Sequence, residues 1–209
     1  MLSVIAGMVD VIGFLSLGLF TAHVTGNLVV IAAQLVRGGP PRLAPILAVP
    51  VFMTAVTAAW LIAKASDRRG PALLRPLLLV QFLLLAGVLI LSVVGGPASN
   101  RHGLIAGVTA MIAVSAMGCQ FGLLRLALTG APSTAVMTGN LTNTVLALLD
   151  TLSRTQRLTA GANERVKRPL EVLVGFFAGC VAGATAVSFL GDWAWALPVV
   201  MAAAAVALR

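Results

Sequence analysis

The sequence is poor in charged residues. Of 209 residues, 14 are Lys or Arg and 6 are Asp or Glu, a charged fraction of 10% where soluble domains have about 25%. A soluble domain of this length needs charged side chains to cover its surface. The shortage excludes a soluble enzyme, a secreted module and a disordered chain.

Cysteine pairs and catalytic motifs are also missing. The two cysteines, Cys119 and Cys180, lie in apolar runs outside any CxxC pattern, so we interpret them as small hydrophobic residues and not as a disulfide. The sequence has no HExxH, no phosphate-binding loop, and no nucleophilic Ser or Cys accompanied by a His and a carboxylate. We therefore expect no enzyme, no cofactor and no metal.

Apolar residues make up 59% of the chain, and the mean hydropathy is +1.04. Four apolar runs, at 46–63, 76–95, 170–190 and 193–208, approach the roughly 20 residues that a membrane-spanning helix needs. Two longer regions, 2–37 and 104–151, are each interrupted by a small-polar stretch. The first residues lack the features of a cleaved signal peptide and are interpreted as the first membrane segment. We predict an all-α integral membrane protein whose main partner is the lipid bilayer.

The basic residues predict the orientation. A net charge of +8 would suggest nucleic acid for a soluble protein, but in a membrane protein Lys and Arg gather in cytoplasmic loops, so no nucleic-acid partner is expected. The loops at 64–75 and 151–168 and the C-terminus carry ten basic residues: Lys64, Arg68, Arg69, Arg75, Arg154, Arg157, Arg165, Lys167, Arg168 and Arg209. The opposite side receives Arg37, Arg42 and Arg101. With one crossing for each interrupted region, this pattern predicts six spans and both termini in the cytoplasm.

An internal repeat divides the chain. Thr-Gly-Asn occurs at Thr25–Asn27 and again, 113 positions later, at Thr138–Asn140. Each copy is followed by two plain spans, so we expect two halves, 1–98 and 99–209, within one membrane domain. Matching loops carry opposite charge, which favours two inverted three-span repeats of the kind found in secondary transporters.

The two Thr-Gly-Asn segments interrupt the first and fourth spans. Gly26 and Gly139 permit a break in each helix, and we expect the flanking Thr25, Asn27, Thr138 and Asn140 to cap the short helix that follows. Two helix N-termini near the bilayer centre would attract an anion, a carboxylate or a carbonyl. The alternative is that these residues only cap and pack two kinked helices.

Other polar residues lie in the same regions. An ionised Asp10 at membrane depth costs about 3 kcal/mol and needs a partner; the hypotheses are an ion pair with Arg125, proton coupling, or a bond to its repeat-mate Gln120. Alternatively, Asp10 lies near the inner interface and Arg125 extends to the membrane surface.

His23 is a plausible proton relay or a packing residue, and Asn143 follows the second copy by one turn. Gly175, Gly179 and Gly183 form a small-residue face typical of helix packing.

These motifs resemble a known family. Ala6-Gly7-x-x-Asp10 followed by Phe20-x-x-His23-x-Thr25-Gly26-Asn27, with a second copy carrying Gly118-x-Gln120 and Met137-Thr138-Gly139-Asn140, is similar to the YoaK-type family of bacterial inner-membrane proteins. The resemblance covers nearly the whole chain. It implies six spans and an inner-membrane location and gives no substrate, because the family is grouped as a domain of unknown function.

Two functional hypotheses follow. The first is a transporter or channel-like permease for a small solute, in which the residues lining the central pathway are Asp10, His23, Thr25, Gly26, Asn27, Gln120, Arg125, Thr138, Gly139, Asn140 and Asn143. The second is a non-transporting membrane scaffold, sensor or assembly protein, in which the same residues hold the two halves together. A homo-oligomer is compatible with both.

Overall fold

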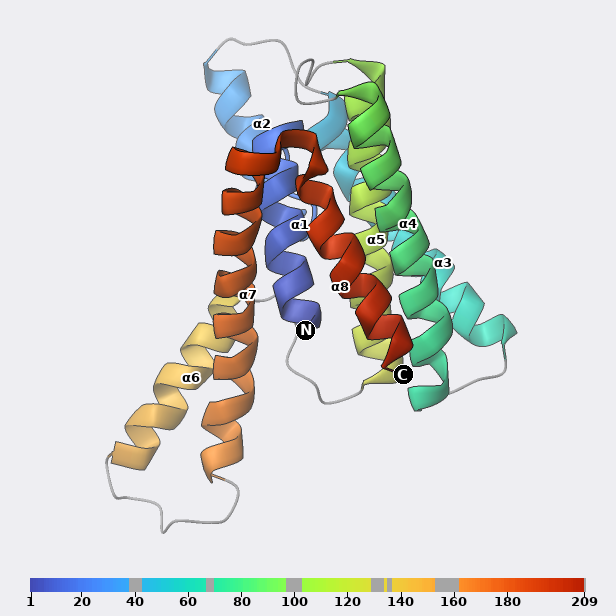
Figure 1. Ribbon diagram of the computed structural model, residues 1–209. Helices are drawn as coiled ribbons and strands as arrows, with labels where there is room; N and C mark the ends of the chain where they lie inside the picture. Colours follow the sequence, from blue (N-terminus) through green and yellow to red (C-terminus); the bar gives the residue numbers. More distant parts are fainter. Residues whose placement is uncertain are drawn as a thin grey trace.

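The computed structural model describes residues 1–37, 43–66, 70–96, 103–128, 134, 137–152 and 162–208. All regular elements of the described residues are helices (Figure 1), which confirms the expected all-α class. Its elements are α1 (Leu2–Leu17), α2 (Gly26–Val36), α3 (Leu43–Ala65), the 3-10 helix η1 (Gly70–Leu73), α4 (Leu74–Gly95), α5 (Leu104–Ala127), α6 (Met137–Leu152), α7 (Ala162–Leu190), the 3-10 helix η2 (Gly191–Trp195) and α8 (Ala196–Ala207).

Four helical stretches are long and apolar enough to cross a membrane: Leu43–Ala65, Leu74–Gly95, Leu104–Ala127 and Val166–Ala207. The fourth joins most of α7 to α8 through η2, where the chain folds back on itself (Figure 1). Helices α1 and α2, with 16 and 11 residues, are shorter. The structure therefore fits a membrane protein.

Two of the expected spans have different bounds. Helix α7 begins at Ala162, eight residues before the expected start at 170, and contains Pro169 within it. Hydropathy marks only the apolar part of a helix, so a charged first turn outside the hydrocarbon escapes it. The run expected at 193–208 also starts later: α8 begins at Ala196, after η2, in which Trp193 is 59% exposed and Trp195 is fully buried.

Helices α1 and α5 form the centre of the molecule. Helix α1 packs against α7, α5 and α8, and α5 packs against α3 and α4. Ile5, Val9 and Ile12 of α1 and Ala113, Met117 and Leu123 of α5 are fully buried. Asp10 and Gln120, the central residues of the two polar clusters described below, therefore lie on enclosed helices.

Small residues bring α1 and α7 into close contact. A Cβ atom on Gly7 would collide with the carbonyl oxygen of Phe176, and one on Gly179 would collide with that of Val4. On α5, a Cβ on Gly118 would come within 2.7 Å of Ala55 of α3. The predicted packing role of the glycine face on α7 is confirmed, because only residues without a side chain allow the backbones to approach this closely.

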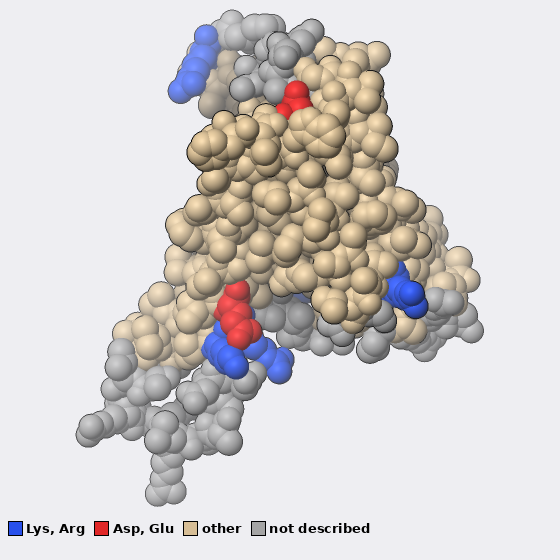
Figure 2. Space-filling model, viewed as in Figure 1, with Lys and Arg blue, Asp and Glu red and all other residues tan. Residues whose placement is uncertain are grey.

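The charged side chains are segregated. On the face shown in Figure 2, Lys, Arg, Asp and Glu lie toward the two ends, and the broad zone between them is uncharged. One described ion pair at an end joins Lys167 and Glu171 at 3.9 Å, both well exposed. An uncharged zone between charged ends is the distribution that a bilayer imposes on the surface it covers.

Candidate functional site

The chain reverses after α1 and returns along it. Gly18 ends α1 in the left-handed conformation, with φ 76°, and its N–H donates to the carbonyl of Phe14. Glycine is the residue that adopts this conformation without steric cost. The reversal brings residues 21–23 back beside Asp10, which lies in the middle of α1.

Asp10 organises this returning segment. Its Oδ1 accepts the backbone N–H groups of Thr21 at 2.9 Å, Ala22 at 2.8 Å and His23 at 3.3 Å. The hydroxyl of Thr21 donates to the carbonyl of Val9 at 3.0 Å. A carboxylate buried among apolar helices is tolerated when it accepts several hydrogen bonds, so Asp10 and the returning backbone satisfy each other.

His23 completes the cluster. Its Nδ1 lies 2.8 Å from Asp10 Oδ2, with the His23 side chain 28% exposed and that of Asp10 6% exposed. The imidazole also packs edge-on against Phe176 of α7, with ring centroids 5.1 Å apart. His23 therefore places a second, partly exposed ionisable side chain beside the buried carboxylate.

The predicted pair between Asp10 and Arg125 is wrong. The ion-pair partner of Asp10 is His23, and Arg125 is exposed on α5, where it lines a groove with α3. Gln120 does not bond to Asp10 either. The returning segment supplies a local partner, 13 residues away in sequence, which hydropathy and repeat matching do not reveal.

Asn27 holds the same loop closed. It is fully buried, its Oδ1 accepts from the N–H of Phe20 at 2.8 Å, and its Nδ2 donates to the carbonyl of Phe20 at 2.8 Å. The side-chain amide thus pairs with Phe20 as a neighbouring strand would. Without this pairing, the N–H and the carbonyl of Phe20 would lose their partner in a part-buried loop, at a cost of up to about 1–3 kcal/mol each.

The expected capping at Thr25 and Asn27 is corrected by this geometry. Thr25 is the residue before α2, but no side chain caps the helix there. The N–H groups of Gly26, Asn27 and Leu28 donate to the carbonyls of His23, Val24 and Thr25, because the chain enters α2 through a tight turn that uses these amides. Anion binding at this turn would require the amides to exchange partners.

Gly26 allows a close approach and not a reversal. A Cβ atom at this position would lie 3.1 Å from the ring of Phe20, which itself stacks on Phe14 with centroids 4.7 Å apart. The positive φ angle in this region belongs to Gly18. Gly18 is therefore the residue that permits the break.

Gln120 forms a second polar cluster on α5. Its Oε1 accepts from Nε2 of Gln81 of α4 at 2.6 Å, and its Nε2 donates to the carbonyl of Leu2 at 3.0 Å and, at a longer 3.4 Å, to the hydroxyl of Thr134. Oε1 of Gln81 is buried without a hydrogen-bond partner in the described structure. The cluster joins α4 and α5 to the start of α1.

The second Thr-Gly-Asn copy lies in the first turn of α6, which begins at Met137. Asn140 is buried, whereas Thr138 and Asn143 are exposed and Gly139 is half-buried. The hydroxyl of Thr144 donates to the carbonyl of Asn140 at 2.8 Å. Most of the stretch before this copy lies outside the described residues, but Thr134 is described and is buried.

Sequence reasoning missed three residues of these clusters. Gln81 interrupts an apolar run of α4, and this isolated polar residue was the available signal. Thr21 and Thr134 stand four residues before the two Thr-Gly-Asn copies, each followed by Ala, so the repeated motif is longer than a tripeptide. A search for the longer Thr-Ala-x-x-Thr-Gly-Asn pattern would have found both.

The helices and the buried clusters define an all-helical protein suited to the membrane, with a polar centre at a helix break. The chain belongs to the family described as "Protein of unknown function (DUF1275)", whose model matches residues 1–208. No curated protein and no solved structure matches the chain.

Proposed function

We propose that this protein is a bacterial inner-membrane permease for a small solute, with Asp10 and His23 as its proton-coupling centre. The observation that carries the proposal is the 2.8 Å contact between Asp10, on the enclosed helix α1, and His23, on the segment that returns along it. Ionisable residues within membrane segments are costly and usually mark ion or substrate pathways. The YoaK-type likeness and the six spans with cytoplasmic termini belong to the same proposal.

The inverted repeat is supported by the course of the chain. In Figure 1, α1, α2 and α4 run upward while α5, α6 and α8 run downward, and α3 and α7 are also opposed. The contacts follow the same pairing of helices between the two halves. The contact of α1 with α7 corresponds to that of α5 with α3, and the contact of α2 with α3 corresponds to that of α6 with α7. A two-fold axis in the membrane plane would produce both relations.

The polar clusters follow the same equivalence. Asp10 on α1 contacts Thr21, and Gln120 on α5 contacts Thr134. In both halves, a polar residue of the central helix forms a hydrogen bond with the threonine that stands four residues before the Thr-Gly-Asn copy. The first half has a carboxylate where the second has a neutral amide, so proton coupling is assigned to the first half alone.

A rearrangement of this cluster would connect proton binding to the helix break. Protonation of Asp10 weakens its hold on the three loop N–H groups, because hydrogen bonds to a charged acceptor are roughly twice as strong as neutral ones. The loop between α1 and α2 is then freer to move. Alternating access in inverted-repeat transporters depends on such movement of one element against the rest.

A scaffold function is the second candidate. Both polar atoms of the Asn27 side chain are bound to Phe20, and Asp10 is held by its own loop. In a scaffold, these hydrogen-bonded side chains would stabilise the fold and have no further role. The two functions differ in whether removing the charge of Asp10 abolishes flux or only lowers stability.

Flux through reconstituted protein tests the proposal. Liposomes loaded with a pH-sensitive dye receive gradients of small monocarboxylates or amino acids, and light scattering follows swelling with glycerol and urea. We expect a solute-dependent pH change that Asp10→Asn and His23→Gln abolish and Glu171→Gln leaves intact. Asn27→Ala and Asn140→Ala should reduce the flux. Flux equal to that of empty liposomes for every solute, with folded protein, would overturn the permease assignment.

A further inference from the structure

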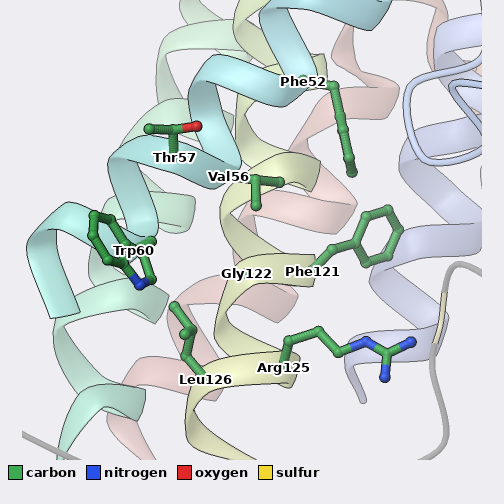
Figure 3. A pocket seen from close by; sticks show the side chains of 8 residues that line it. All are labelled: Phe52, Val56, Thr57, Trp60, Phe121, Gly122, Arg125 and Leu126. Carbon is green, nitrogen blue, oxygen red and sulfur yellow. The ribbon is translucent and has the colours of Figure 1, made fainter. Parts of the chain in front are cut away.

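A groove between α3 and α5 lies apart from the polar clusters. It has a volume of about 470 Å³ and is lined by Phe52, Val56, Thr57 and Trp60 of α3 and by Phe121, Gly122, Arg125 and Leu126 of α5 (Figure 3). The volume falls in the range of roughly 300–1,000 Å³ typical of small-molecule sites. Except for Arg125, no lining residue carries a charge.

Arg125 is the unusual member of this lining. Its side chain is exposed, and Figure 3 shows it extended from α5 on the same side as Phe121. Within the described part of the chain, no carboxylate forms an ion pair with it. The planar set of donors of a guanidinium fits a phosphate group.

The neighbouring residues resemble a membrane interface. Lys64 Nζ lies 5.2 Å from the ring centroid of Trp60, and Trp60 is 48% exposed. Both are in the last two turns of α3, and Arg125 is in the last turn of α5. Indole rings and basic side chains are enriched where lipid head groups meet the hydrocarbon.

The groove leads from this level toward the bilayer centre. From Trp60 to Phe52 it follows eight residues of α3, or about 12 Å at the helical rise of 1.5 Å per residue. One leaflet of hydrocarbon is about 15 Å deep. The groove therefore has an apolar channel of acyl-chain length with two cations near one end.

We propose that this groove binds an anionic phospholipid of the leaflet that faces the C-terminal end of α3, with the phosphate at Arg125 and one acyl chain along Phe52, Val56 and Phe121. Charge complementarity selects an anionic lipid over a zwitterionic one. Basic pockets between membrane helices are known to bind such head groups. The site requires only that the protein resides in a membrane, so it does not depend on the permease proposal.

Native mass spectrometry of the detergent-purified protein tests this site, with dioleoyl phosphatidylglycerol and dioleoyl phosphatidylcholine as probes. We expect preferential binding of phosphatidylglycerol, weakened about tenfold by Arg125→Gln and partly retained in Arg125→Lys. Arg75→Gln is the matched control, because Arg75 is exposed near the start of α4 and is not part of the groove. Val56→Trp should fill the groove and reduce binding of both lipids, whereas Met53→Trp, outside it, should not.

Three outcomes would overturn the proposal. Equal losses for Arg125→Gln and Arg75→Gln would mean that surface charge alone holds the lipid. Inorganic phosphate that displaced the lipid at millimolar concentration would assign the site to a free anion. A dimer that excludes lipid and dissociates in Val56→Trp would assign the groove to a second copy of the chain. A melting temperature of Arg125→Gln in detergent equal to that of the wild type ensures that lost binding does not reflect unfolding.

Discussion

His23 Nδ1 and Asp10 Oδ2 are 2.8 Å apart although 13 residues separate them in the chain. The contact exists because the segment after α1 turns back at Gly18 and lies along the helix that it has just left. Asp10 therefore fastens the break to the centre of the bundle. The segment between α1 and α2 is therefore fixed by specific contacts, and substitution of each residue can test its contribution.

Removal of the Asp10 charge should destabilise the protein. In Asp10→Asn, the hydrogen bonds to Thr21, Ala22 and His23 lose their charged acceptor, and we expect the free energy of unfolding to fall by about 1–3 kcal/mol. Denaturant unfolding in detergent measures the change. Glu171→Gln, which also replaces a carboxylate with a neutral amide but in an exposed pair, should change stability by less than about 0.5 kcal/mol. Equal effects of the two substitutions would contradict the role assigned to Asp10.

Asn27→Ala should be more damaging than a surface substitution. It removes a fully buried side chain and leaves the part-buried N–H and carbonyl of Phe20 without their partner, so we expect a loss of about 1–3 kcal/mol in the free energy of unfolding. Asn143→Ala, at an exposed position of α6, is the control and should have little effect. Similar unfolding curves for the two variants would show that the pairing of Asn27 with Phe20 contributes little.

Gly179 of α7 should differ sharply from Gly87 of α4. Gly179→Ala places a methyl group against the carbonyl of Val4 and should force α1 and α7 apart, at a cost of about 1–3 kcal/mol. Gly87→Ala meets nothing within 4 Å and should stabilise α4 by about 0.5–1 kcal/mol through its helix propensity. Thermal unfolding of both variants measures the difference, and no difference between them would argue against close packing at Gly179.

The predicted orientation can be read from single cysteines. With Cys119 and Cys180 replaced by Ala, Ser66→Cys marks the end of α3 and Arg37→Cys the end of α2, and both positions are exposed. In intact cells, a membrane-impermeant maleimide should label Arg37→Cys from outside and reach Ser66→Cys only after lysis. The opposite pattern would reverse the topology inferred from the basic loops.

Much of the fold could be predicted because the hydropathy of a membrane helix is a property of its own sequence. The runs at 46–63 and 76–95 fall within α3 and α4. Each of the two small-polar stretches begins after the end of one helix, α1 or α5, and extends into the first turns of the next, α2 or α6. Hydropathy reports whether a segment suits lipid, which depends on its own residues. It missed the charged start of α7, which lies outside the apolar run.

The candidate site was only partly predictable. Asp10, His23, Asn27 and Gln120 were identified because polar side chains are rare in such a sequence, but their partners were not. The choice of Arg125 for Asp10 assumed that opposite charges in the membrane must meet. The structure instead satisfies Asp10 with backbone amides and His23, because a reversing chain brings its own donors.

The scarcity of charge thus determined, from the sequence alone, that apolar helices would dominate and that a few polar residues would stand out. Only the tertiary structure decided which of them touch. Hydrogen bonds act over about 3 Å, and the reversal at Gly18 sets which atoms come within that distance of Asp10. The same folding places Arg125 on an open groove, where its charge faces the surroundings instead of the core.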